Sequence, residues 1–273
     1  MPSGGRGQRL RIVFAVGGLA GVGLGLAWSG LRRPTPFPAP VGPSRDMGTV
    51  PLPGDLPVPV LRYLRGVLPD PSPRQTSAVV CGVGRIRIGP VWLPLRFRYS
   101  LLAGQAYRHE MEVVLWGRRL LRAHEQFRQG HARLELPFGT VADSRQVDSA
   151  ANVALWGEMV WLPAVFVTDP RVRWQDVGQG KAALIVPSPE GHDRLEFAFD
   201  AESGLPTAVE ALRYRRPNDS AKAPWRVEFQ AWGTFRGVRA PSRLSVRWLD
   251  EAGPWLRLEV HSVSHNVDIP GLD

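Results

Sequence analysis

A single cysteine, Cys81, excludes an internal disulfide from this chain of 273 residues. Lysine is almost as scarce, since only Lys181 and Lys222 accompany the arginines among the 34 basic residues. The arginines are spread along the chain without an aromatic-interleaved motif, so the net charge of +9 is not gathered into a groove for phosphates. We therefore expect no nucleic-acid partner.

Motifs of known catalytic sites are also missing. The chain has no nucleophile elbow, no phosphate-binding or dinucleotide glycine loop and no His-Glu-x-x-His helix. Cys81 lies in an apolar, strand-like stretch where a small core residue fits better than a nucleophile. His261 and His265 lie about 13 Å apart in an extended strand, too far to share one metal ion. We expect no metal, no cofactor and no catalytic residue, and favour a protein that is not an enzyme.

The N-terminal region predicts an exported protein. Residues 12–31 carry no charge and follow a basic segment, 1–11, so they predict a transmembrane helix or a signal sequence. The cell membrane is then the expected location, with the following domain outside the cytoplasm; cleavage near Ser29 and secretion is the alternative. The proline-rich stretch 32–54 predicts an extended spacer, and 55–273 an exported domain.

The rest of the chain is mainly strand-like. Apolar and polar residues alternate in segments separated by glycine-containing turns. About a dozen antiparallel strands usually curl or close. We predict strands over 79–88, 92–101, 107–116, 119–127, 132–136, 172–174, 182–186, 195–199, 207–214, 225–234, 244–249 and 256–264, after a short helix near 56–65.

One helix is expected inside the globular part, over 149–167. Its residues leave almost no polar face, so it should be enclosed on most sides. Ser149 or Asp148 can cap its start, and Pro163 should end it. The predicted fold class is α+β, mainly β: a curved antiparallel sheet, or unclosed barrel, with this helix in its concavity and an N-terminal transmembrane helix.

Glu158 is the one charge that interrupts this helix. It predicts either a ligand-binding or proton-handling acid in a pocket, or an ion pair with one of the arginines, which is the commoner arrangement. Other arginines recur at alternate strand positions, and Glu110 with Glu112 can face them. We interpret the pairs as an ion-paired outer face of the sheet. These pairs are Arg85 with Arg87, Arg96 with Arg98, and Arg213 with Arg215.

Two motifs resemble an uncharacterised bacterial family, a domain of unknown function with a membrane anchor and an exported domain. They are Leu56-Pro57-x-Pro59-Val60-x-Arg62-Tyr63-Leu64 and Glu158-x-x-Trp161-Leu162-Pro163. Shorter matches follow in order, and the resemblance covers roughly residues 55–262. They are Val172-x-Trp174, Ala182 with Leu184, Phe199-Asp200, Gly204-Leu205, Pro224-Trp225-Arg226, the run 237–241 and Val246-x-Trp248. Ala151 and Ala154 depart from the pattern, which commonly has charges there.

The resemblance brings no known activity, and it implies a fold similar to that of periplasmic lipoprotein-carrier proteins. We expect a membrane-tethered domain that binds an apolar or lipid-like ligand beneath a helix that can move. An interaction or scaffold module of the cell envelope without a ligand is the alternative, and a hydrolase using Glu158 a third. The sequence does not identify a protein partner. The candidate cavity residues are Trp156, Glu158, Met159, Trp161, Trp174 and Trp225.

Overall fold

The structure is a computed structural model that describes residues 30–40 and 45–272. Almost all of the predicted membrane segment, 12–31, lies outside these residues. In the part that is described, no helix has the length and hydropathy needed to cross a bilayer.

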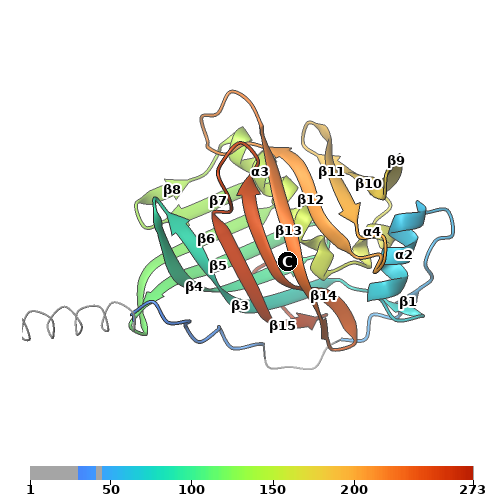
Figure 1. The fold of residues 1–273 in the computed structure, drawn as a ribbon, viewed down its shortest axis with the longest axis horizontal. Coiled ribbons are helices and arrows are strands. Elements are labelled where there is room, and N and C mark those ends of the chain that lie inside the picture. The colour runs from blue at the N-terminus through green and yellow to red at the C-terminus, as the bar shows by residue number, and fades with distance from the viewer. Residues whose placement is uncertain (1–29, 41–44, 273) are drawn as a thin grey trace, which may run out of the picture.

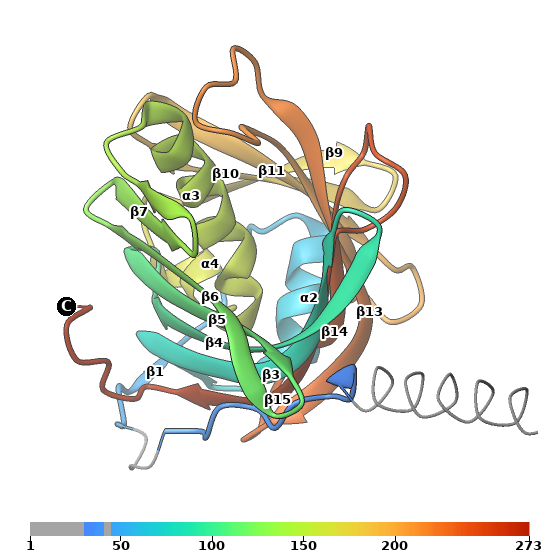
Figure 2. The same ribbon diagram turned by 90° about the vertical axis from the view of Figure 1, so that its left-hand side faces the viewer.

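One antiparallel sheet dominates the described chain (Figure 1). Thirteen of the described strands form it, in the order β8-β7-β6-β5-β4-β3-β15-β14-β13-β12-β11-β10-β9. The sheet curves into a half-barrel whose ends, β8 and β9, do not pair, so the predicted unclosed barrel is confirmed (Figure 2). Its strands are β3 (Ser77–Ile88), β4 (Val91–Leu102), β5 (Ala106–Leu115), β6 (Arg118–Arg128), β7 (His131–Leu136), β8 (Gly139–Val141), β9 (Arg173–Gly178), β10 (Lys181–Ser188), β11 (Gly191–Phe199), β12 (Pro206–Arg213), β13 (Ala223–Phe235), β14 (Val238–Trp248) and β15 (Leu256–His265).

The predicted strands all correspond to strands of this sheet. Three short ones were not predicted: β8, and the separate pair β1 (Thr49–Val50) and β2 (Ser72–Pro73). Two or three residues are too few for an alternation of apolar and polar positions to be visible.

The central helix lies in the concavity, but its bounds differ from the prediction. α3 (Arg145–Glu158) is capped by Ser144, whose hydroxyl accepts a hydrogen bond from the Val147 amide. Ser149 is buried inside it, and every residue from 149 to 157 is buried. The α-helix ends before Pro163 and continues as η1 (Met159–Trp161) and then α4 (Val165–Thr168).

Asp148 also has another role than the predicted cap. Its carboxylate accepts a hydrogen bond from the Ala132 amide at 2.6 Å, which joins α3 to β7. Residues 145–148 are polar except for Val147, so the first turn shows too little apolar periodicity to be recognised.

The other predicted helix is α2 (Val58–Val67), with a proline in its first turn. Its buried face includes Tyr63, which packs against Phe199 and Trp232 at ring-centroid distances of 6.0 Å each. This helix therefore packs against β11 and β13.

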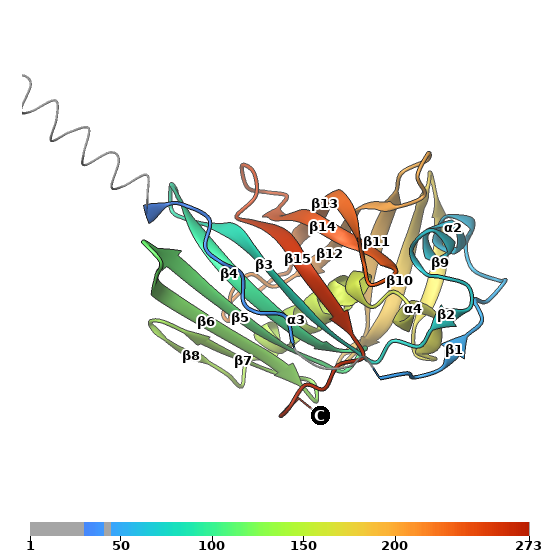
Figure 3. The same ribbon diagram turned by 90° about the horizontal axis from the view of Figure 1, so that it is seen from below.

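Part of the proline-rich stretch before the domain packs against the domain. Arg33 pairs with Glu259 at 2.9 Å, and the Phe37 ring lies 4.5 Å from the Arg96 guanidinium carbon. The Pro38 carbonyl accepts a hydrogen bond from Arg98. Residues 33–38 therefore run along the convex face of the sheet (Figure 3).

Candidate functional site

The concave face of β5 presents an unusual inward row of Tyr107, His109 and Met111. The His109 ring lies between two tyrosine rings, with centroid distances of 3.9 Å to Tyr99 and 4.1 Å to Tyr107. All three of these rings are at least 96 % buried. An imidazole in such a place needs polar partners for its nitrogens.

Two carboxylates supply those partners. His109 Nε2 lies 2.7 Å from Glu158 Oε2 on α3, and His109 Nδ1 lies 3.8 Å from Glu125 Oε2 on β6. Tyr107 donates a hydrogen bond to Glu125 Oε1 at 2.5 Å. We call His109, Glu125, Glu158 and Tyr107 the buried acid-histidine cluster.

The cluster shifts the proton affinities of its members. Burial would lower the pKa of His109, but the charges and hydrogen bonds of Glu158 and Glu125 outweigh it and raise that pKa to about 9. Burial would raise the pKa of Glu125, but His109, Arg213 and Tyr107 lower it to about 2. Burial raises the pKa of Glu158, and His109 offsets this only in part. At neutral pH the cluster therefore holds an imidazolium beside an ionised Glu125.

We predicted an arginine as the ion-pair partner of Glu158. This prediction is wrong, because the partner is His109. Arg213 was also predicted on the outer face of the sheet, and it lies on the inner one. Its Nε donates to the Ala150 carbonyl at 2.9 Å, and its guanidinium covers the buried Trp225 ring. Arg213 shares its face of the sheet with the inward residues of neighbouring strands. This shared face is the sequence signal that could have placed Arg213 on the inner side.

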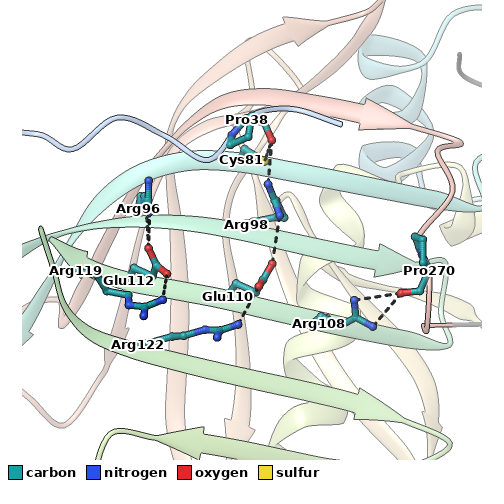
Figure 4. Close-up of polar contacts among 10 residues, drawn as sticks. All are labelled: Pro38, Cys81, Arg96, Arg98, Arg108, Glu110, Glu112, Arg119, Arg122 and Pro270. Carbon is teal, nitrogen blue, oxygen red and sulfur yellow. Dashed lines mark hydrogen bonds and ion pairs between the residues drawn. The ribbon is translucent and has the colours of Figure 1, made fainter. Parts of the chain in front are cut away.

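The other predicted outer-face pairs of Figure 4 are confirmed. Glu112 pairs with Arg96 at 2.7 Å and with Arg119 at 3.2 Å. Glu110 pairs with Arg98 at 3.6 Å and with Arg122 at 3.3 Å, completing a row of alternating charges across β4, β5 and β6 (Figure 4). This charge row stays on the convex face, away from the cluster.

An inner cavity of about 90 Å³ lies between the cluster and the sheet. Most of its wall is apolar, with residues from β13, β14 and β15 opposite α3. Among the described residues, the buried indole nitrogens of Trp225 and Trp255 have no hydrogen-bond partner, and both side chains line this cavity. The lining also includes Met111, His109, Glu125, Glu158, Trp161, Arg213, Val227, Phe229, Leu244, Val246 and Leu258.

An outer cavity of about 260 Å³ adjoins the inner one on the same concave face. Its wall is almost entirely carbon, and Met111 is the one described side chain that lines both cavities. A methionine is flexible enough to separate or join them. The other lining residues are Ile86, Ile88, Leu95, Val113, Leu121, Arg122, Ala123, Leu136, Pro137 and Phe138.

The six predicted cavity residues lie in three different places. Glu158, Trp161 and Trp225 line the inner cavity. Trp156 lies instead beside a surface hollow near Gly104 and Arg128.

Met159 and Trp174 belong to the core. Met159 is fully buried, and its sulfur accepts a hydrogen bond from the Gly104 amide at 3.4 Å. Trp174 packs edge-on against Phe166 and Phe197.

Both ring nitrogens of His109 face carboxylates, so each nitrogen already has a polar contact. His265 is likewise engaged, with Nε2 2.8 Å from the Trp161 carbonyl oxygen. The residues that the structure describes contain no group of three or more side chains suited to a metal ion.

A model described as a family of unknown function (DUF6544) matches residues 49–259. The chain belongs to this family. The resemblance carried by the Leu56 and Glu158 motifs is thus confirmed. No curated protein matches this member of the DUF6544 family.

Solved structures similar to this DUF6544 chain have low sequence identity. A LolA superfamily protein from Nitrosomonas europaea is 8 % identical, with a TM-score of 0.46, and the match covers 78 % of this chain and 93 % of that one. A DUF1329 family protein from Desulfovibrio piger is 11 % identical, with a TM-score of 0.44 and coverage of 71 % and 88 %. A domain from Vibrio parahaemolyticus, described as a candidate outer membrane lipoprotein-sorting protein, is 8 % identical, with a TM-score of 0.42 and coverage of 78 % and 91 %.

Proposed function

We propose that this DUF6544 protein binds a single-chain amphiphile, of the fatty-acyl type, on the concave face of its half-barrel. The observation that carries the proposal is the pair of adjoining cavities that meet at Met111. The outer cavity offers carbon surface to a chain, and the inner one offers hydrogen-bond donors to a head group. Pockets that combine an apolar wall with a few polar groups are typical of small-molecule sites.

The donors of the inner cavity select the head group. The indole N–H groups of Trp225 and Trp255 lack acceptors, and a buried donor without a partner costs about 1–3 kcal/mol. A carboxyl or ester oxygen would satisfy them beside the Arg213 guanidinium. The inner cavity is smaller than the roughly 150 Å³ that holds a benzene ring, so it suits a small head group and not a bulky one.

The tether is part of the same proposal. Residues 12–31 would hold the domain at the outer face of the cell membrane, where acyl chains are at hand. Protease digestion of intact spheroplasts tests this placement: the domain should be cut, and protection of the domain until the cells are lysed would contradict it.

Uptake of a fluorescent fatty acid by the purified full chain tests the binding. Ala123 faces Met111 across the β5–β6 pair and lines the outer cavity, so Ala123→Phe should fill the cavity and weaken binding at least tenfold. Leu212→Phe, at an exposed position of β12, is the matched control and should bind like the unchanged chain. If none of the three proteins takes up the probe, the chain is instead an interaction or scaffold module with no ligand.

A further inference from the structure

We propose that one end of the half-barrel is a surface that docks on a lipid bilayer, and that the outer cavity opens onto it. We call this surface the apolar rim. The docking shares with the proposed function the placement of residues 12–31 in the membrane, and the idea that the cavity is loaded from the bilayer rests on the proposed function as a whole. The rim consists of Ile88, Val91, Trp116, Leu120, Leu136 and Phe138, all of them exposed.

The rim is continuous in space although its residues are distant in sequence. The β3–β4, β5–β6 and β7–β8 turns lie at the same end of the sheet, since alternate turns of consecutive antiparallel strands do so. Phe138 is 93 % exposed and Trp116 is 59 % exposed, which are costly positions for large apolar side chains in water. Exposed apolar residues gathered at one place mark an interaction site.

The outer cavity and the rim share residues. Ile88, Leu136 and Phe138 each line the cavity and each remain exposed. A chain leaving the cavity by this route would meet only carbon surface until it passed Phe138. The cavity therefore has its mouth at the rim.

The N-terminal end of the described chain lies at the same place. A methyl group on Gly30 would sit only 2.5 Å from a ring carbon of Trp116, so Gly30 packs directly on that indole. Residues 33–38 are held on the convex face and lead to this point (Figure 3). The apolar run 12–31 thus ends beside the rim, and a bilayer that contains this run must lie next to it.

The charges around the rim fit an anionic membrane surface. Arg32 and Arg33 come just after Gly30 and Leu31, and Arg118 and Arg119 begin β6 just after the β5–β6 turn. Arg33 and Arg119 each pair with one carboxylate, Glu259 and Glu112. Apolar side chains bordered by arginines are the pattern of a surface that inserts at the headgroup level of anionic lipids. A second copy of the chain would bring the same positive charges together, so the observations favour the bilayer over a dimer.

Site-specific fluorescence on the full chain tests the proposal. We would reconstitute the Phe138→Cys and Leu120→Cys variants into nanodiscs of phosphatidylcholine and phosphatidylglycerol at a 3:1 ratio and attach an environment-sensitive fluorophore. Cys81 is buried, and burial raises the pKa of its thiol, so it should react slowly. Leu212→Cys, on β12 and 60 % exposed against 56 % for Leu120, is the matched control.

Docking predicts blue-shifted emission at positions 138 and 120, quenched several-fold by nitroxide-labelled lipid chains, with no such change at position 212. Water-like emission at both rim positions would overturn the proposal. Blue-shifted emission without lipid quenching would overturn it too, because a protein surface or second copy would then cover the rim. Fatty-acid uptake by the same samples is a separate readout: uptake with a water-exposed rim refutes docking alone, and a quenched rim without uptake refutes the proposed function alone.

Discussion

At the scale of single residues, His109 is the cation around which the interior charges of the half-barrel are arranged. Taking ionised groups out of water is unfavourable unless each has a partner, and removing one partner of a buried pair costs about 3–5 kcal/mol. Here one imidazole serves Glu125 and Glu158 together. The two carboxylates are therefore not equivalent, because the same cation lowers the pKa of one while burial raises the pKa of the other.

This inequality predicts different effects of two similar substitutions. Glu125→Gln should lower the free energy of unfolding at pH 7 by roughly 3 kcal/mol, because the pKa of about 2 shows how strongly the fold stabilises the carboxylate. Glu158→Gln should cost less, because burial raises the pKa of Glu158 and the fold therefore stabilises its ionised form less. Urea denaturation of the two variants measures both values.

The pH dependence checks the same assignment. The folded-state pKa of Glu125 lies below the usual value of 4.5, so its contribution is complete above pH 4.5 and is lost as the pH falls toward 2. The stability difference between the unchanged chain and Glu125→Gln should shrink over that interval. A difference that stays constant down to pH 2.5 would show that Glu125 acts through packing alone.

His109 predicts a second pH dependence, of opposite direction. Its folded-state pKa is raised from 6.5 to about 9, so its stabilisation is complete below pH 6.5 and is lost as the pH rises toward 9. The free energy of unfolding should fall by up to roughly 3 kcal/mol across that range. His109→Gln should flatten the profile, whereas His131→Gln, at a largely exposed side chain, should keep it.

The sequence could identify only part of this site. Glu158 attracts attention because it is a charge in an apolar helix, and the need for a partner follows from burial. The identity of that partner does not follow, because His109 lies 49 residues away from Glu158. The curvature of the sheet brings His109 to α3, and no local sequence pattern predicts that curvature. The alternation of β5, with Arg108, Glu110 and Glu112 outward, does place His109 on the inner face, and this was the usable signal.

At the scale of elements, α3 is held in the concavity by polar contacts at its N-terminal half. Asn152 Nδ2 donates to the Pro187 carbonyl and to Asp193 Oδ2, at 2.9 Å each. Asp148 and Ala150 bond to β7 and to Arg213. These contacts explain why a helix with several small side chains keeps one position against the sheet.

Asn152→Ala should loosen this attachment. The change leaves the Pro187 carbonyl without its donor and costs about 1–3 kcal/mol. Amide hydrogen exchange should quicken over residues 145–158 more than in β3 or β15, because the lost contacts belong to the helix. Arg145→Ala removes only an exposed ion pair with Glu190 and should leave stability nearly unchanged. Equal quickening in α3 and the central strands would mean that the helix does not open separately.

Elements were easier to predict than contacts for a physical reason. A strand such as β11, with Leu195 and Phe197 buried on one face, repeats its pattern every two residues and can be recognised locally. The ends of α3 depend on a serine cap and on a change to a tighter helix at Met159, and neither leaves a periodic signal. The bounds of the helix were therefore wrong although its place in the fold was right.

At the scale of the whole molecule, the pairing of β3 with β15 joins the two halves of the chain. On one side lie β4 to β8, which precede α3, and on the other lie β9 to β14, which follow it. The last strand must therefore be made before the sheet is continuous. Disruption of this one pairing should affect both halves together.

Gly82 is the position that tests this dependence. A methyl group there would lie 2.2 Å from the Glu259 carbonyl oxygen on β15 and 2.8 Å from the Phe97 ring, so either the backbone pairing or the core must shift. Gly82→Ala should lower the unfolding free energy by several kcal/mol, since overpacking typically costs about 1–3 kcal/mol and the pairing of two strands is strained as well. Gly66→Ala, in α2 with open space around it, should be neutral or stabilising by up to about 1 kcal/mol.

Because one sheet spans the chain, tryptophan fluorescence and far-UV circular dichroism should report a single unfolding transition in both variants, shifted only for Gly82→Ala. Two separate transitions in Gly82→Ala would show instead that the halves fold independently and that β15 merely docks one on the other.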